Sequence, residues 1–314
     1  MASWQMHVVA LALRTTRRRH WTTADAGRSR LARPKAEAPP PRRLRRAHEV
    51  SQRTVRGFPV WSVRPRTPSG PAAMYLHGGA YLNGIASQHW TLIGRLADAG
   101  VRVEVPLYGL APQHTHREAY PFVREVWATL ADEAPSGGLV LAGDSAGGGL
   151  ALGLAQQLVA DGVAVPDRLV LLSPWLDLTL SNPQLAEYER RDPWLARPGL
   201  VEAGLAWAAG DDPTSPPLSP GSGPLAGLPP TTVFVGTREI GYPDAAAFAT
   251  AAAAAGVDVA LTVAEGAVHV YPLVPAPEGA EGARAVTDAV AGRQPSLSGA
   301  GGGSNPRRRR GLWR

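Results

Sequence analysis

Apolar runs and amphipathic stretches alternate along the middle of the chain. Short apolar runs, typical of buried strands, lie near residues 72–76, 101–105, 138–142, 168–172, 231–236 and 257–263. The stretches that predict helices lie near residues 88–99, 117–133, 146–160, 243–255 and 281–291. Strands that alternate with helices form a largely parallel sheet with helices on both faces. The pattern therefore predicts an α/β fold, which residues 54–65, with their weak alternation, open as a pair of strands.

Two regions depart from this alternation. Residues 174–230 are rich in Pro and contain Trp175, Trp194 and Trp207, which suit either the lining of a pocket or the core. Residues 1–50 are basic and have apolar positions that fit one short amphipathic helix, namely Trp4, Val8, Val9, Leu11 and Leu13. We expect a basic arm over residues 1–50, a folded domain over 51–292 with an insertion near 174–230, and a disordered basic tail over 293–314.

Charge is distributed unevenly along the 314 residues. The net charge is +6, but residues 1–56 hold 14 Lys and Arg against 3 Asp and Glu, and residues 293–314 hold 6 Arg and no acid. Residues 57–292 hold 12 basic against 23 acidic side chains, so the central domain is acidic. Basic arms can contact nucleic acid or anionic lipid, but no recognisable nucleic-acid module accompanies them. We therefore interpret the arms as solvated ends and predict no nucleic-acid partner.

The composition excludes several classes of chemistry. The chain has no cysteine, so disulfides, thiolate catalysis and Cys-based metal sites are excluded. No run approaches the roughly 20 apolar residues that span a membrane. The N-terminal apolar stretch from Val8 to Leu13 is short, and arginines follow it instead of preceding it, unlike a secretory signal. We expect a cytoplasmic protein without a transmembrane segment.

Ser145 lies in the pentapeptide Gly-Asp-Ser-Ala-Gly over residues 143–147, between the apolar run 138–142 and a helix-forming run. This G-x-S-x-G motif in a strand–turn–helix setting is the nucleophile elbow. A serine hydroxyl needs exposure and an adjacent base to act as a nucleophile. The motif by itself is weak, because it also fits a Gly-rich turn. Ser145 is our candidate nucleophile, and it requires further support.

Backbone donors for an oxyanion are expected at two places. The buried run 72–76 is followed by His77-Gly78-Gly79-Ala80, which is similar to the HGGG-type loop that partners the elbow. Glycines let backbone N–H groups approach an oxygen that becomes negative. We expect donors from Gly78, Gly79 and Ala146, and we expect the His77 imidazole to hold the loop.

The base and the acid follow from chain order. In α/β-hydrolases the triad runs Ser, acid, His along the chain. Of the 8 histidines only His269 follows Ser145, so it is the candidate base. The carboxylate belongs after the apolar run 231–235, where Glu239 is nearest. Asp244 is the alternative acid, although it is also placed to cap the next helix.

Together these segments identify a family resemblance. The chain resembles the hormone-sensitive-lipase-like group of α/β-hydrolases, bacterial carboxylesterases and lipases, from about residue 55 to about 290. The matching segments run in family order: 77–81, 105–112, 143–148, 172–177 and 266–269. Many relatives carry Asp-Pro at the acid position, whereas this chain has Glu239-Ile240.

The resemblance implies an α/β-hydrolase fold and a serine hydrolase that cleaves carboxylic esters with short to medium acyl groups, including acetyl esters. It also implies a lid over the site, made by the N-terminal segment and the 174–230 insertion. The mechanism needs a small-molecule ester and no metal or organic cofactor. Two alternatives stay open: an amidase or peptidase on the same scaffold, and a non-catalytic small-molecule receptor. The oligomeric state is not predicted.

Overall fold

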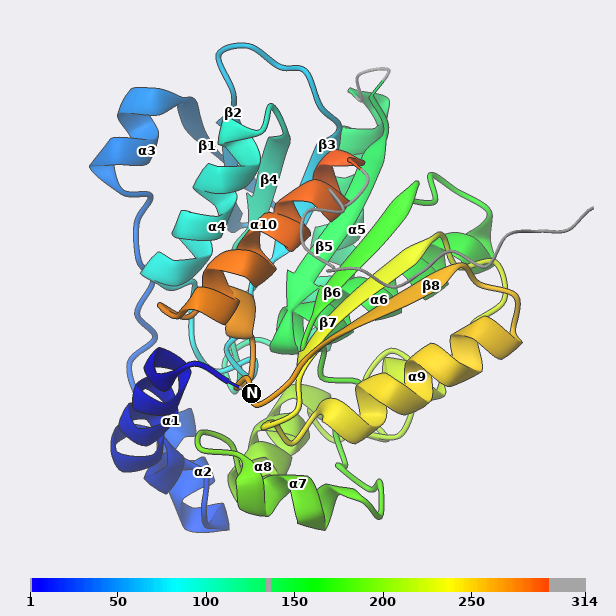
Figure 1. Cartoon of the computed structure of the whole chain (residues 1–314). Helices are drawn as coiled ribbons and strands as arrows, with labels where there is room; N and C mark the ends of the chain where they lie inside the picture. The colour runs from blue at the N-terminus through cyan, green and yellow to red at the C-terminus, as the bar shows by residue number, and fades with distance from the viewer. Residues whose placement is uncertain (1, 134–136, 294–314) are drawn as a thin grey trace, which may run out of the picture.

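The computed structural model describes residues 2–133 and 137–293, which form one eight-stranded sheet with helices on both faces (Figure 1). The strand order is β1-β2-β4-β3-β5-β6-β7-β8. β1 pairs antiparallel with β2, and β2 pairs antiparallel with β4. The other six strands, in the spatial order β4, β3, β5, β6, β7 and β8, are parallel to one another. The strands are β1 Glu49–Val55, β2 Phe58–Arg64, β3 Ala72–Leu76, β4 Arg102–Pro106, β5 Leu139–Asp144, β6 Arg168–Leu172, β7 Thr231–Gly236 and β8 Val259–Ala264.

The register of the central strands brings the two glycine-rich loops together. β3 pairs with β5 from Ala72 opposite Leu139 to Leu76 opposite Gly143. Both strands therefore end at the same edge, and the loop that starts at His77 lies beside the turn at Ser145. Every residue of β3 is buried, as expected for a central parallel strand covered on both faces.

Helices pack on both faces of the sheet. α4 Ser87–Asp98 and α10 Pro277–Ala291 share one hydrophobic cluster with residues from one side of the strands. α5 His116–Asp132, α6 Ser145–Asp161 and α9 Tyr242–Ala254 share the other cluster. Each helix buries an apolar stripe, and for α4 this includes Trp90, Ile93 and Leu96. The sheet is thus the middle of three layers.

Four further helices gather at one end of the molecule, where β5, β7 and β8 end (Figure 1). They are α1 Trp4–Thr16, α2 Ala24–Leu31, α7 Leu185–Arg191 and α8 Arg197–Ala208, and we call them the cap helices. α2 crosses α8 closely, because a Cβ added at Gly27 would lie 2.7 Å from the Gly199 Cα. α3 Arg42–Ala47 lies apart from them, near β1.

The predicted α/β-hydrolase fold is confirmed, and the predicted strands and helices of the central region lie within a few residues of their observed bounds. The opening hairpin begins earlier than predicted, at Glu49, so the expected boundary between residues 50 and 51 falls inside β1. The sequence did not predict four of the observed helices, which are α2, α3, α7 and α8 over residues 24–31, 42–47, 185–191 and 197–208. The predicted disordered tail lies outside the described residues, apart from Arg293.

Helix α1 forms where the sequence predicts an N-terminal helix, but its buried side chains differ from the predicted apolar positions. Met6 and Ala10 are buried, whereas Trp4, Val8 and Leu11 are 72%, 55% and 62% exposed. The expectation that these three apolar side chains are buried is therefore wrong. In the part of the chain that the structure describes, no helix combines the length and the apolar character needed to cross a bilayer.

Candidate active site

Ser145 forms a sharp turn between β5 and α6. Its φ of +52° lies in the left-handed region, which is strained for a residue with a side chain. The turn is held by close packing of α6 on β3, since a Cβ at Gly147 would lie 2.1 Å from the Leu76 carbonyl oxygen. Glycine is required there. The Ser145 hydroxyl is consequently presented at the N-terminus of α6, where the helix dipole favours negative charge.

His269 lies in the loop after β8 and contacts both of its expected partners. The Ser145 hydroxyl lies 2.9 Å from His269 Nε2. On the other side of the ring, His269 Nδ1 lies 2.5 Å from Glu239 Oε2. These distances fit a ring that accepts from Ser145 and donates to Glu239. The sequence places these three residues far apart, and the fold brings them into one hydrogen-bonded row.

Glu239, and not Asp244, is the carboxylate that contacts His269. Glu239 follows β7, is fully buried, and accepts the Gly236 N–H at 3.1 Å with its other oxygen. Asp244 lies in the first turn of α9 and accepts from Asn182 Nδ2 at 2.8 Å. Burial raises the pKa of Asp244 to about 6. Asp244 is therefore a wall residue of the site.

The electrostatic environment favours a protonated His269. Burial lowers the pKa of this imidazole, but the charge and the hydrogen bond of Glu239 outweigh burial, and Asp192 and Asp144 act in the same direction. The net pKa is raised above its ordinary value. This is the direction that a base needs if it is to hold a proton during the reaction.

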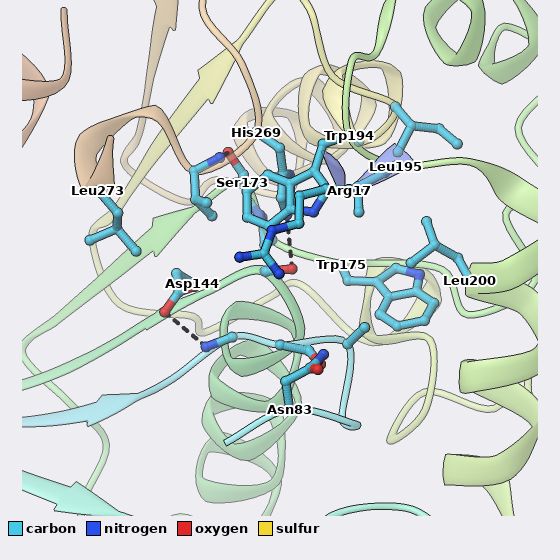
Figure 2. Close-up of a pocket in the computed structure, with 18 of the residues that line it drawn as sticks. Arg17, Asn83, Asp144, Ser173, Trp175, Trp194, Leu195, Leu200, His269 and Leu273 are labelled. Carbon is cyan, nitrogen blue, oxygen red and sulfur yellow. Dashed lines mark hydrogen bonds between the residues drawn. The ribbon is translucent and has the colours of Figure 1, made fainter. Parts of the chain in front are cut away.

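Asp144 links the elbow to the loop after β3. It is buried and accepts from the Tyr75 hydroxyl at 2.7 Å and from the Gly78 N–H at 2.9 Å (Figure 2). Burial raises the pKa of this carboxyl, but interactions with His89, Tyr75 and Gly78 outweigh it, and the pKa is lowered. Asp144 therefore stays charged and ties the two loops together.

This bond changes the expected set of oxyanion donors. The Gly78 N–H is engaged by Asp144, so the expectation that it points at a substrate oxygen does not fit the geometry. The N–H groups of Gly79 and Ala80 have no hydrogen-bond partner among residues 2–133 and 137–293. Ala146 is the second residue of α6, whose first N–H groups have no partner in the helix.

The imidazole of His77 holds the loop, as predicted from the sequence. Its Nδ1 donates to the Gly78 carbonyl at 2.8 Å, and its ring stacks on Tyr108 with centroids 4.6 Å apart. Burial lowers the pKa of His77 to about 4, so the ring is neutral. His89 is buried, and its Nε2 lies 3.3 Å from Asp144 Oδ2.

Asp192 is a site residue that the sequence did not point to. It is buried in the turn after α7 and accepts from the N–H groups of Trp194 and Leu195, at 2.6 and 2.8 Å. Its other oxygen accepts the Ile240 N–H at 2.8 Å, directly beside Glu239. Burial raises the pKa of Asp192 to about 6. Asp before Pro193 indicates a turn, but nothing in the sequence indicates that this turn packs against the acid loop.

A cavity of about 330 Å³ opens above Ser145 and His269. Trp175 and Trp194 line it, whereas Trp207 is buried in the core against Tyr81, with ring centroids 4.2 Å apart. The cap helices and their loops contribute Leu13, Arg17, Trp21, Arg30, Leu195 and Leu200 to its walls. Among the described residues, no group of three or more His, Asp or Glu is arranged to hold a metal ion.

Comparison with known proteins agrees with this geometry. A family model described as the alpha/beta hydrolase fold matches residues 73–273. An acetyl-hydrolase of Streptomyces hygroscopicus is 34% identical over 230 residues, 71% of this chain and 75% of that protein. An esterase of Acinetobacter venetianus is 35% identical over 189 residues, 59% of this chain and 62% of the relative.

The fold has close counterparts among solved structures. An esterase from the bacterial hormone-sensitive lipase family superposes with a TM-score of 0.72 at 28% identity. The match covers 91% of this chain and 96% of that one. The similarity therefore extends well beyond the segment around the elbow.

Proposed function

We infer that Ser145, His269 and Glu239 are the catalytic triad of this chain, which belongs to the hormone-sensitive-lipase-like group of the α/β-hydrolase family and hydrolyses carboxylic esters. The single observation that supports the triad best is the continuous row from the Ser145 hydroxyl through His269 to Glu239, at 2.9 and 2.5 Å. This is the arrangement in which a histidine activates a serine and a carboxylate orients the histidine.

The reaction proceeds in two steps. His269 Nε2 takes the proton of Ser145 as Oγ attacks the ester carbonyl, and Glu239 stabilises the imidazolium that forms. His269 then gives the proton to the leaving alcohol, and an acyl group remains on Ser145. Water enters, loses a proton to the same nitrogen, and attacks the acyl carbonyl. The acid leaves and Ser145 regains its hydrogen.

The oxyanion of both steps is bound by Gly79, Ala80 and Ala146. This set replaces the donors predicted from the sequence, because the Gly78 N–H belongs to Asp144 and the Gly79 and Ala80 N–H groups have no partner in the described structure. An alanine at position 80 leaves the backbone donor in place. Loss of one such donor typically costs a factor of about 10²–10³ in rate.

The cap helices act as a lid in this proposal. Residues of α1, α2 and the loop before α8 line the cavity, so the arm and the 174–230 insertion both cover Ser145. Exclusion of water in this way strengthens the electrostatic interactions inside the site.

The proposed substrates are esters with short to medium acyl groups, acetyl esters among them. A cavity of about 330 Å³ supports this size, and the names acetyl-hydrolase and ethyl acetate hydrolase belong to two of the relatives. The cytoplasmic location and the absence of a nucleic-acid partner stay predictions.

Replacement of Ser145 tests the proposal. Ser145→Ala should lower kcat on p-nitrophenyl acetate by about 10⁶-fold, because the nucleophile is lost. A fluorophosphonate probe should label the wild type at Ser145 and fail to label the variant. Ser51→Ala, at an exposed position on the edge strand β1, is the control and should match the wild type in both assays. Turnover by Ser145→Ala at the wild-type rate, with an unchanged circular dichroism spectrum, would refute the triad.

A further inference from the structure

Two arginines reach the cavity above Ser145 from the cap. Arg17 follows α1 and Arg30 lies in the last turn of α2, and both line the same cavity as Ser145 and His269. Figure 2 shows the Arg17 side chain extending into this space, with its guanidinium group near the centre of the view. The catalytic cavity therefore has a cationic wall.

Arg17 differs from its neighbour Arg18 in having no partner. Arg18 donates to the backbone carbonyls of Glu189 and Leu195, at 2.9 and 2.7 Å, so its role is structural. The Arg17 guanidinium makes no hydrogen bond or ion pair within residues 2–133 and 137–293. The remaining segments contain no Asp or Glu side chain that could pair with it. Its donors are open to a ligand.

Arg30 adds a second positive charge that the protein holds in place. Its Nη2 donates to Asn83 Oδ1 at 2.8 Å, and its guanidinium lies over the Trp21 ring at 4.4 Å. Its Nε is buried without a hydrogen-bond partner. Burial, together with repulsion from Arg33 and Arg17, lowers the pKa of Arg30 to about 10, so it stays charged at neutral pH.

The acidic side chains of the cavity do not neutralise these arginines. Asp144 is bound to Tyr75 and Gly78, and Asp244 is bound to Asn182. Neither carboxylate forms an ion pair with Arg17 or Arg30. Both arginines come from the basic segment 1–56, whereas the central domain on which this segment packs is acidic.

We propose that Arg17, with Arg30 beside it, binds a carboxylate carried by the ester substrate, so that the enzyme prefers esters with a free carboxylate on the acyl or the alcohol part. A guanidinium presents paired N–H donors that match the two oxygens of a carboxylate. Such a bond fixes the ester relative to Ser145. This inference rests on the proposed ester hydrolysis and specifies its substrate class.

Matched pairs of esters test the proposal. For the acyl side, mono-p-nitrophenyl adipate is compared with p-nitrophenyl hexanoate. For the alcohol side, 4-acetoxybenzoate is compared with methyl 4-acetoxybenzoate. The measured quantity is the ratio of kcat/KM for the anionic ester to that for the neutral one, in the wild type, Arg17→Gln, Arg17→Lys and Arg14→Gln. Arg14 is exposed in the last turn of α1 and does not line the cavity, so its replacement removes the same charge at a distance.

For at least one pair, Arg17→Gln should lower the ratio about tenfold or more, mainly through KM, because a hydrogen bond to a charged group is lost. Arg17→Lys should have a ratio between those of Arg17→Gln and the wild type, and Arg14→Gln should have the wild-type ratio. Added salt should lower the ratio in the wild type. An equal ratio in the wild type and Arg17→Gln for both pairs would overturn the proposal, as would an equal loss in Arg14→Gln. Absence of turnover of both the anionic and the neutral esters by the wild type would instead indicate that the proposed hydrolysis itself is wrong.

Discussion

The three triad residues each follow the end of a different parallel strand. Ser145 follows β5, Glu239 follows β7 and His269 follows β8, and all three strands end at one edge of the sheet. β5 and β7 are almost entirely buried, and β8 pairs with β7 along its length. The sheet therefore fixes the positions of side chains that the loops alone would leave variable. At the scale of single residues, the chemistry depends on which partners each side chain contacts.

The identity of the acid is tested by two isosteric substitutions. Glu239→Gln should lower kcat by about 10³–10⁴-fold, because the amide can present the wrong group to His269 Nδ1 and cannot stabilise the imidazolium. Asp244→Asn should change kcat by less than about tenfold, since Asp244 bonds to Asn182 and not to His269. The measurement is kcat on p-nitrophenyl acetate. A larger loss in Asp244→Asn would reverse the assignment.

The pH dependence of the reaction follows from the raised pKa of His269. Only the neutral imidazole accepts the proton of Ser145, so kcat/KM should rise with pH through the pKa of the free enzyme. Because Glu239 raises that pKa, the midpoint should lie above the ordinary value of 6.5. Glu239→Gln removes the strongest of the interactions that raise the pKa of His269, so the midpoint of the residual activity should move to lower pH. Equal midpoints would show that Glu239 does not set the pKa.

Secondary-structure elements act on the site mainly through close backbone packing. α6 approaches β3 at Gly147, and α2 approaches α8 at Gly27 and Gly199. In both cases a side chain would enter space that is already occupied by backbone. The first contact forms the elbow, and the second positions Trp21 and Arg30 in the cavity wall.

The contact between α2 and α8 is tested by a β-branched substitution. Gly27→Val should lower the free energy of unfolding by about 1–3 kcal/mol, because the new side chain overlaps the Gly199 backbone. Ser29→Val, on the exposed side of the same helix, should change it by less than about 0.5 kcal/mol. Valine favours a helix more than glycine does, so a loss in Gly27→Val comes from packing. Chemical denaturation measures the free energy of unfolding of both variants. Equal values for Gly27→Val and the wild type would contradict the close contact.

Over the whole molecule, the basic N-terminal arm is part of the folded structure and not a solvated end. Ser3 bonds to Glu278 of α10, and Arg18 bonds to carbonyls of α7 and of the turn that follows it. The arm thereby fastens the insertion to the body and completes the cavity over Ser145. The interpretation of residues 1–50 as solvated is wrong for these contacts, because buried donors and acceptors connect them to distant segments.

Arg18 is the residue whose loss should loosen the cap. Arg18→Gln removes donors to the carbonyls of Glu189, Asp192 and Leu195, so amide hydrogen exchange over residues 185–208 should become faster. Arg19→Gln removes the same charge from an exposed neighbour and should leave exchange unchanged. Mass-spectrometric hydrogen–deuterium exchange measures both. Identical exchange in Arg18→Gln and the wild type would show that this contact does not hold the cap.

The sequence by itself determined the fold class and predicted the nucleophile and the base of the proposed triad. Buried parallel strands require near-continuous apolar runs, and a glycine-flanked serine between strand and helix indicates a nucleophile elbow when a glycine-rich donor loop and a later histidine accompany it. His269 followed from chain order alone. These features are local, or depend only on order along the chain, so they can be read from one sequence.

Only the tertiary structure brought Glu239 and not Asp244 into contact with His269, bound the Gly78 N–H to Asp144, and placed Asp192 beside Glu239 and Arg17 in the cavity wall. Each of these depends on which groups meet across loops that are far apart in sequence. A hydrogen bond is satisfied or left open according to three-dimensional distance, and burial sets the pKa of a carboxyl according to what surrounds it. Neither quantity is a property of the residue or of its neighbours along the chain.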